Sequence, residues 1–392
     1  MPDVSPNTVT ATIKANLASQ LPPGIRSRQI DNGNGLNMHI LEAGFEQPGR
    51  ECVLLLHGFP ELAYTWRKIM LPLAEAGYHV IAPDQRGYGL TEGGDTRYEG
   101  DISQYRLLNM VRDVLGLVFA LGYKSVAAVV GRDIGSPVAA TCALTRPDVF
   151  CSVALMSAPY PGVPGFRFDG VNSAAKAAKV HQDLAALTPP RLHYQLYLCM
   201  PDANAHMLAC PQGMHDFLRA YYHMKSADWA GNDPAPLASA NAADLAAMPE
   251  YYVMALGKTM PETVAAAMPS AREIAACDWL PDEELAVYSS VFADTGLQGG
   301  LQWYRALGSA ENQAEMLLFA GKTITVPSCF MAGASDWGIY QSPGAFEAMQ
   351  SRACSDMRSC DLIPGAGHWL ELEKPQIVIE KLLGFLASLQ KA

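Results

Sequence analysis

Short apolar runs alternate with stretches of helical periodicity along much of this chain. Runs rich in Val, Ile, Leu and Ala that are too short for helices predict buried strands, and they lie at residues 52–56, 79–82, 125–130, 151–156, 323–332 and 360–363. Residues 26–30 and 36–41, on the two sides of a turn signal, are further short strand candidates. Apolar residues at helical spacing predict helices at residues 61–76, 103–121, 343–352 and 375–389. This alternation predicts an α/β fold with a mostly parallel, twisted sheet that is flanked by helices.

Two segments depart from this alternation. The sequence DNGNG at residues 31–35 is a strong turn signal, so the strands on its two sides are expected to form a hairpin. From about residue 160 to 310 the pattern is helical without strands, which predicts an inserted helical domain. We therefore expect a first part of the core at 1–158, with a surface helix over 5–20, a helical domain at 159–310, and a second part of the core at 311–392.

The segment VAAVVGRDIGSPVAA at residues 126–140 predicts a sharp turn between a strand and a helix. Gly131 and Gly135 lack side chains that would collide with the opposing backbone, and Pro137 falls in the first helical turn, where a missing N–H costs nothing. Asp133 is at the apex, beside the positive end of the helix dipole. The turn presents a carboxylate that is either a nucleophile or, in the simpler interpretation, a cap of the following helix.

An aspartate at this apex narrows the possible chemistry. A carboxylate that attacks an alkyl carbon forms an ester, which water can cleave, whereas a serine would form a stable ether. If Asp133 is a nucleophile, the electrophile is therefore an alkyl carbon with a leaving group, such as an epoxide or a halide.

Two later residues fit the acid and the base that such a nucleophile requires. Asp336 follows the predicted strand at 323–332, and His368 follows the one at 360–363. The chain order of nucleophile, acid and base is the order expected of this architecture. We expect His368 to activate water for attack on the ester, while Asp336 orients the imidazole and stabilises its charge.

The turn His57-Gly58-Phe59-Pro60 follows the strand at 52–56, at the sheet edge where open α/β folds bind ligands. The N–H of Phe59 could point into the same pocket as the N–H of Ile134, and two such donors would stabilise an oxyanion. We expect the His57 side chain to be a structural part of the turn. Asp84 and Arg86 are expected to form a structural pair.

Composition excludes several classes of partner. The chain has 392 residues, a formal net charge of -11 and no basic run, which argues against binding to nucleic acid or an anionic membrane. The first residues lack the apolar core of a signal peptide, and no apolar run reaches membrane-spanning length, so we expect a cytoplasmic protein. The nine cysteines are scattered and never spaced as C-x-x-C, which favours reduced thiols and no metal site.

Several short motifs are spread over most of the chain. They are HGFPE at 57–61, DQRGYG at 84–89, GRDIGS at 131–136, YQLY at 194–197, LQWYR at 301–305, ASD at 334–336 and GHW at 367–369. Together they resemble the epoxide hydrolase family of α/β-hydrolase-fold enzymes. The resemblance implies conversion of a small-molecule epoxide to a vicinal diol through a covalent ester at Asp133, without a cofactor, beneath a helical cap (lid) domain.

The same resemblance implies roles for further residues. In that family two cap tyrosines hydrogen-bond the epoxide oxygen, and the matching positions are Tyr194 and Tyr304. A phenol with a pKa of about 10 can protonate the alkoxide that remains tethered when an epoxide opens. The family pattern also assigns the oxyanion-hole N–H groups to Phe59 and Ile134. The residues expected to contact the substrate are Phe59, Ile134, Tyr194, Trp303, Tyr304, Trp337 and Trp369.

Two departures from the family pattern bear on the alternative functions. Arg132 is present where the family often has histidine, and Ile134 where it often has tryptophan. The missing indole removes a halide donor of haloalkane dehalogenases, and Phe59 supplies no replacement. A haloalkane or haloacid dehalogenase with the same triad is therefore the second hypothesis, and a non-catalytic ligand-binding protein of the same fold is the third.

Overall fold

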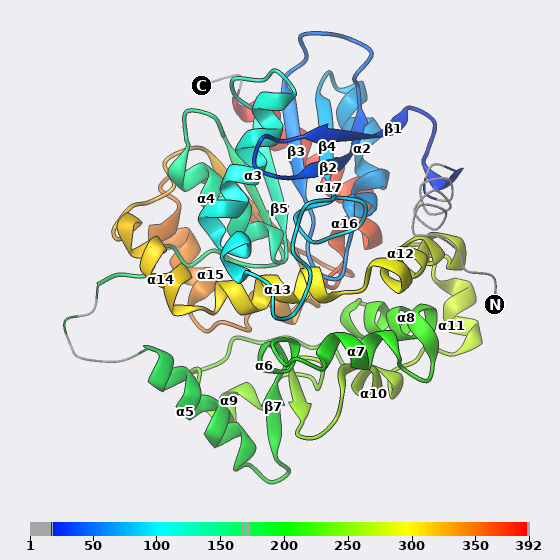
Figure 1. Cartoon of the computed structure of the whole chain (residues 1–392), viewed down its shortest axis with the longest axis vertical. Helices are drawn as coiled ribbons and strands as arrows, with labels where there is room; N and C mark the ends of the chain where they lie inside the picture. The colour runs from blue at the N-terminus through cyan, green and yellow to red at the C-terminus, as the bar shows by residue number, and fades with distance from the viewer. Residues whose placement is uncertain (1–16, 18, 167, 169–172, 390–392) are drawn as a thin grey trace.

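The computed structural model describes residues 17, 19–166, 168 and 173–389. Its largest element is an eight-stranded sheet with the order β1-β2-β4-β3-β5-β6-β9-β10 (Figure 1). The strands are β1 (Ile25–Asp31), β2 (Asn37–Ala43), β3 (Cys52–Leu56), β4 (His79–Pro83), β5 (Ala128–Arg132), β6 (Val153–Met156), β9 (Ser328–Gly333) and β10 (Met357–Ile363). The surface helix expected over 5–20 falls almost entirely outside the described residues.

The sheet is mostly parallel, as the alternation of strands and helices predicted. The hairpin of β1 and β2 is antiparallel, β2 also pairs antiparallel with β4, and the strands from β4 to β10 pair in parallel. All residues of β3, β5, β6 and β9 are buried. Their continuous apolar sequences arise because a parallel strand in the middle of such a sheet is covered on both faces.

Helices cover the two faces of the sheet. Helices α3 (Leu107–Ala120) and α4 (Gly135–Thr145) pack together in front of it in Figure 1, and α2 (Arg67–Glu75) packs against α17 (Pro375–Leu389) behind it. Short 3-10 turns at Ala63–Trp66 and Ile102–Tyr105 precede α2 and α3. Smaller elements in the last third of the core are Trp337–Ile339, α15 (Ala345–Ala348), a π-helical turn at Met349–Ala353, and α16 (Leu370–Glu373).

The long segment between β6 and β9 is mainly helical and lies beside the lower edge of the sheet in Figure 1. One expectation for it was wrong, because the three-residue strands β7 (Arg191–His193) and β8 (Val253–Ala255) pair antiparallel there. Strands this short carry no periodic signal. The helices are α5 (Ser173–Ala185), α6 (Tyr194–Leu198), α7 (Ala203–Leu208), α8 (Gly213–Lys225), α9 (Ala242–Leu245), α10 (Met260–Ala265), α11 (Ala271–Ala276), α12 (Asp282–Thr295), α13 (Gln298–Leu307) and α14 (Ala310–Met316), with a 3-10 turn at Leu317–Phe319.

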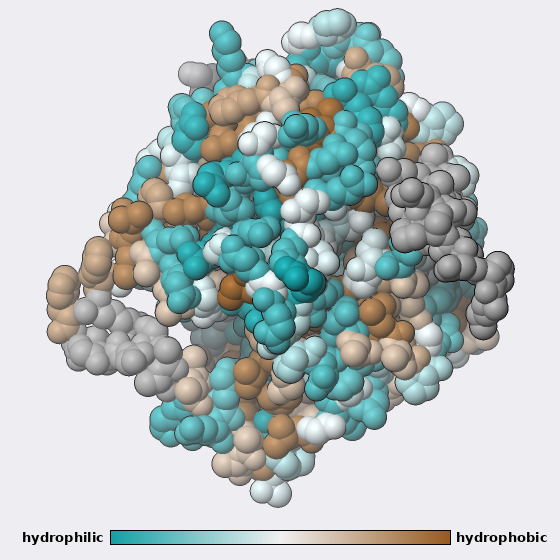
Figure 2. All heavy atoms as spheres, viewed as in Figure 1, coloured by the Kyte–Doolittle hydropathy of each residue, from teal (hydrophilic) through white to brown (hydrophobic). Residues whose placement is uncertain are grey.

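The surface is consistent with the acidic, mixed composition of the chain. The face in Figure 2 is largely hydrophilic, and its hydrophobic residues form separate groups. In the described part of the chain, no helix combines the length and the apolar character needed to cross a bilayer. All nine cysteines are free, and the described residues contain no cluster of His, Cys, Asp or Glu that could hold a metal ion.

Candidate active site

The turn between β5 and α4 presents Asp133 as the sequence predicted. Asp133 has a φ of 51°, a left-handed conformation that is uncommon for residues other than glycine, and its N–H donates to Met156 O at 3.1 Å. A Cβ on Gly131 would lie 2.3 Å from Gly135 O, and a Cβ on Gly135 would lie 2.5 Å from His57 O. Both glycines are therefore required by the close packing that holds the strained apex in place.

The turn after β3 approaches the carboxylate of Asp133 from the neighbouring strand. The Phe59 N–H donates to Asp133 Oδ1 at 3.0 Å. A Cβ on Gly58 would lie 2.5 Å from Asp133 Cβ and 2.7 Å from its Oδ1, so the contact depends on the absence of a side chain there. The Ile134 N–H is at the start of α4, and its place in an oxyanion hole stays a prediction.

The structure brings Asp336 and His368 to Asp133 from two other strands. Asp336 follows β9 and His368 follows β10, and parallel strands place their carboxyl ends at one edge of the sheet. His368 Nδ1 lies 3.0 and 3.1 Å from the two carboxylate oxygens of Asp336. His368 Nε2 lies 3.4 Å from Asp133 Oδ2 and makes no hydrogen bond within the described residues. The ring is thus held on one side and directed at the first carboxylate on the other.

The charges around Asp133 favour its ionised form. Burial acts to raise the pKa of this carboxyl, but the His368 imidazole and the cations of Lys225 and Arg132 outweigh it, so the pKa lies below its ordinary range. The pKa of Asp336 is also lowered, because His368 and Lys225 oppose the effect of burial. Lys225, at the end of α8, is a buried cation that the sequence analysis missed, and burial lowers its pKa to about 8.

Tyr194 and Tyr304 both lie beside Asp133. Their ring centroids are 6.1 Å apart, and Tyr304 packs edge-on against Phe59 at 5.5 Å. The Tyr194 hydroxyl donates to Gln341 Oε1 at 3.0 Å. Burial, and then the charge of Asp133, raise the pKa of both phenols, so both remain protonated at neutral pH. A cavity of about 280 Å³ joins these groups, and its walls are Asp133, Ile134, Pro137, Ala158, Tyr194, Gln195, Tyr304, Leu307, Gly308 and Gln341.

Three tryptophans expected to contact the substrate do not line this cavity. Trp303 is fully buried, and its indole N–H donates to Arg86 O at 2.9 Å. Trp369 is also fully buried and stacks on Tyr222, with ring centroids 4.1 Å apart. Trp337 is 6% exposed and lies outside the cavity wall. Trp303 precedes Tyr304 in α13, where neighbouring side chains point about 100° apart, so adjacency in sequence was a poor guide.

Other polar residues of the motifs have structural roles. The His57 ring lies between Gly58 O at 2.8 Å and the Gln85 N–H at 3.1 Å, as expected for a structural histidine. Asp84 and Arg86 do not pair with each other, which corrects the expectation. Asp84 binds His39 at 2.7 Å, whereas Arg86 binds Asp113 at 2.6 Å. The sequence analysis also missed the fully buried ion cluster of Arg132, Glu61 and Glu371 beneath the turn.

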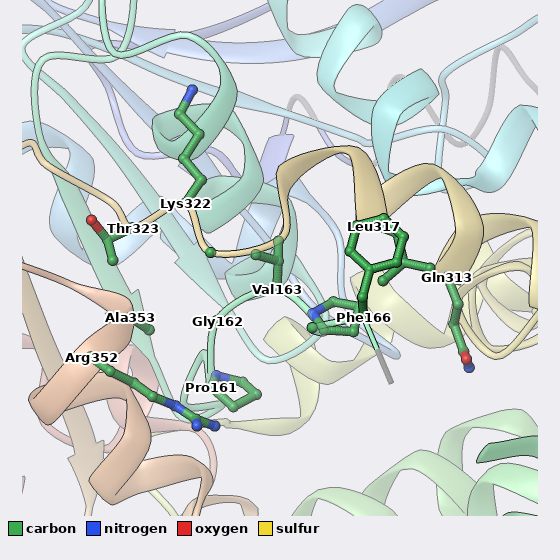
Figure 3. Close-up of a pocket in the computed structure, with 13 residues that line it drawn as sticks. Pro161, Gly162, Val163, Phe166, Gln313, Leu317, Lys322, Thr323, Arg352 and Ala353 are labelled. Atoms are coloured by element: carbon green, nitrogen blue, oxygen red, sulfur yellow. The ribbon is translucent and has the colours of Figure 1, made fainter. Parts of the chain in front are cut away.

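A larger cavity, of about 1010 Å³, is separate from the triad. Pro161, Gly162 and Val163 lie between Arg352 on one side and Leu317 on the other (Figure 3). Most of its wall is exposed side chain, and none of the residues that form it belongs to the triad or the tyrosine pair. We therefore place the candidate active site at the smaller cavity, which Asp133, Tyr194 and Tyr304 line.

Comparisons with known proteins agree with this geometry. A family model described as alpha/beta hydrolase fold matches residues 51–187. The chain is 34% identical to epoxide hydrolase A and 30% identical to epoxide hydrolase B of Mycobacterium tuberculosis; these matches cover 94% and 92% of this chain and 99% and 98% of the relatives.

Solved structures give the same result. An epoxide hydrolase from an endophytic Streptomyces superposes with a TM-score of 0.75 at 29% identity, covering 95% of this chain and 98% of that one. Potato (Solanum tuberosum) epoxide hydrolase I superposes with a TM-score of 0.70 at 27% identity, covering 93% and 99%. Full-length similarity at this level, on a fold with the elbow and the three converging strand ends described above, shows that the chain belongs to the epoxide hydrolase family of α/β-hydrolase-fold enzymes.

Proposed function

We propose that this protein hydrolyses a small-molecule epoxide to a vicinal diol with Asp133 as nucleophile. The observation that carries the proposal is the environment of one carboxylate. Asp133 Oδ1 accepts the Phe59 N–H, Oδ2 faces His368, and the cavity beside it is lined by Tyr194 and Tyr304. Residues 159–310 act as the cap that supplies both tyrosines.

In the first step, Asp133 Oδ2 attacks one oxirane carbon. The bond between that carbon and the epoxide oxygen breaks, and its electron pair goes to the oxygen. Oδ1 is held by the Phe59 N–H, which leaves Oδ2 as the free nucleophilic atom. Tyr194 and Tyr304 donate hydrogen bonds to the oxygen as its charge develops, and one of them transfers its proton. The product of this step is an alkyl ester of Asp133.

In the second step, water cleaves that ester. His368 Nε2 removes a proton from a water molecule, and the hydroxide attacks Asp133 Cγ. Asp336 stabilises the imidazolium through its contacts of 3.0 and 3.1 Å. The oxyanion forms at Oδ1, where the N–H groups of Phe59 and Ile134 stabilise it. Collapse breaks the bond between Cγ and the alkyl oxygen, and the diol takes the proton from His368. The acid proton that remains on Asp133 returns to the tyrosine that gave up its proton in the first step, which restores both the carboxylate and the phenol.

The cavity also bears on the choice between an epoxide and a halide. Halide release calls for N–H or indole donors near the leaving group, whereas Ile134, Pro137 and Leu307 of the wall are aliphatic. The two side-chain amides of the wall already have acceptors, because Gln195 donates to the Tyr194 hydroxyl and Gln341 donates to Gly338 O. Two phenols facing the nucleophile suit an oxygen that must gain a proton. This arrangement favours the epoxide over the halide as substrate.

A panel of epoxides, from small aliphatic to bulky aromatic, tests the proposal. Diol formation is measured beside halide release from matching haloalkanes, and Asp133→Ala is the control that should abolish turnover. In a single turnover in heavy-oxygen water, the first diol should carry oxygen from the protein, and Asp133 should gain the label. Label in that first diol with Asp133 unlabelled would contradict the covalent route.

A further inference from the structure

Arg132 directly precedes the candidate nucleophile and is fully buried. Its guanidinium has three separate polar partners. Nη1 donates to Glu61, Nη2 donates to the backbone carbonyl of His368, and Nε lies 2.8 Å from Glu371 Oε2 without hydrogen-bond geometry. The guanidinium also lies 4.7 Å from the centre of the Trp369 ring. One side chain thus connects β5 with the turn after β3 and with the loop that carries His368.

These partners continue to the groups that would act on the ester. Glu61 Oε2 also accepts the Gly58 N–H at 3.0 Å, and the next N–H in the chain, that of Phe59, holds Asp133 Oδ1. The carbonyl that Arg132 binds belongs to His368 itself. A planar guanidinium with donors in fixed directions can serve three partners at once, which a lysine ammonium cannot do with the same geometry.

The cluster contains one more carboxyl group than cations. The Thr65 hydroxyl lies 2.9 Å from Glu61 Oε1 and 2.7 Å from Glu371 Oε1. A hydroxyl has one proton to donate, so one of these two contacts requires a protonated carboxyl as the donor. Burial raises the pKa of Glu371 well above its usual range, despite the attraction of Arg132. Glu371 is therefore the carboxylic acid, and it donates to the Thr65 hydroxyl.

We propose that Arg132 is a positioning residue that aligns the His368 loop and the Gly58-Phe59 turn with Asp133. Glu371 is the partner of the Arg132 Nε, which would otherwise be buried without a polar neighbour. The inference rests on the proposed function, because it concerns the second step of that reaction. His368 acts only on ester cleavage, and the Phe59 N–H, which holds Oδ1 in both steps, stabilises an oxyanion only during ester cleavage. Loss of their alignment should therefore slow ester cleavage far more than ester formation.

Three variants test the proposal: Arg132→His, Glu371→Gln and the double variant. The rates of ester formation and ester cleavage are measured separately by rapid quench and mass spectrometry of the intact protein. Arg132→His should slow cleavage about a hundredfold, the cost of a misplacement of about 1 Å, and change formation only a few-fold. Glu371→Gln should be nearly neutral, because an amide replaces a neutral acid. The double variant should cleave the ester at least tenfold faster than Arg132→His.

Matched variants separate positioning from general stability. Arg86→His removes another buried arginine, paired with Asp113, and should lower stability without changing the ratio of the two rates. If Arg132→His does not fold, Arg132→Lys replaces it in the test. Lysine keeps the positive charge but lacks the planar guanidinium with donors in fixed directions, so this variant should still cleave the ester slowly and form it at a nearly normal rate. Equal slowing of both steps, or a large loss with Glu371→Gln alone, would overturn the proposal.

A measurement without substrate distinguishes failure of the inference from failure of the proposed function. If the wild-type protein converts no epoxide, the proposed function fails. The coupling of Arg132→His and Glu371→Gln is then read from the unfolding equilibrium in urea. If Arg132 and Glu371 act as a pair, the unfolding equilibrium constant of the double variant should differ by at least about tenfold from the value obtained by multiplying the effects of the two single variants. Independent effects overturn this pairing.

Discussion

Replacing Asp336 by asparagine should slow the hydrolysis of the ester without preventing its formation. The Asp336 carboxylate is 1% exposed and contacts His368 Nδ1 with both oxygens. The ring becomes positively charged only when it takes a proton from water, which belongs to the second step. Asparagine keeps the shape of the side chain and removes the negative charge that stabilises this cation.

The size of the effect follows from the distance between the charges. Two charge centres about 4 Å apart interact by about 4 kcal/mol at an effective dielectric constant of about 20. At about 1.4 kcal/mol per tenfold change in rate, this corresponds to roughly a thousandfold slower ester cleavage. Ester formation, which does not charge the ring, should change by less than about tenfold. The ester at Asp133 should therefore accumulate in Asp336→Asn.

The assay mixes the protein rapidly with excess epoxide, quenches samples at set times, and measures the ester by intact-protein mass spectrometry. The diol is quantified in the same quenched samples. Asp84→Asn is the matched control, because Asp84 is also buried and binds a histidine, His39, at 2.7 Å. The control should lower stability and leave the ratio of the two rates unchanged. Absence of accumulated ester in Asp336→Asn, or equal loss of both rates, would refute the assigned role of Asp336.

Three further predictions follow from the same geometry. Tyr194→Phe or Tyr304→Phe alone should slow ester formation about tenfold to a hundredfold, and the double variant should nearly stop it in a single-turnover measurement; an unchanged rate of ester formation in the double variant would contradict the phenol roles. Gly58→Ala should cost about 1–3 kcal/mol of unfolding free energy in urea, because its Cβ would meet Asp133 at 2.5 Å; an unchanged midpoint and activity would count against that contact. Asp133 and Asp336 have pKa values below the ordinary 3.8, so their contribution to stability is complete above about pH 4 and is lost as the pH falls. Urea unfolding as a function of pH should therefore show a shallower acid limb in Asp133→Asn than in the wild-type protein.

The fold was predictable from local patterns because burial and turn formation leave local traces. Continuous apolar runs identified the strands β3, β4, β5, β6, β9 and β10 of the large sheet, with boundaries shifted by a few residues, but not the short strands β7 and β8. The strand expected at 125–130 is found at Ala128–Arg132, since Val126 forms only an isolated bridge with Phe150. The elbow was equally visible, because a close turn needs glycines on both sides of its apex. The roles of Asp133, Asp336 and His368 were then assigned from the predicted strand that each of them follows.

Tertiary structure decided which side chains meet. The sequence contains Glu61, Arg132 and Glu371 far apart, and nothing local indicates that they share one buried cluster. The same holds for Trp303 and Trp369, whose motif neighbours suggested a substrate contact, although both are core residues. Hydrophobic periodicity reports whether a side chain is buried and says nothing about its partner. The sequence alone therefore determined the strands, the elbow and the types of its reacting groups, whereas the distances between those groups and their electrostatic environment depended on how the strands and the helical segment pack.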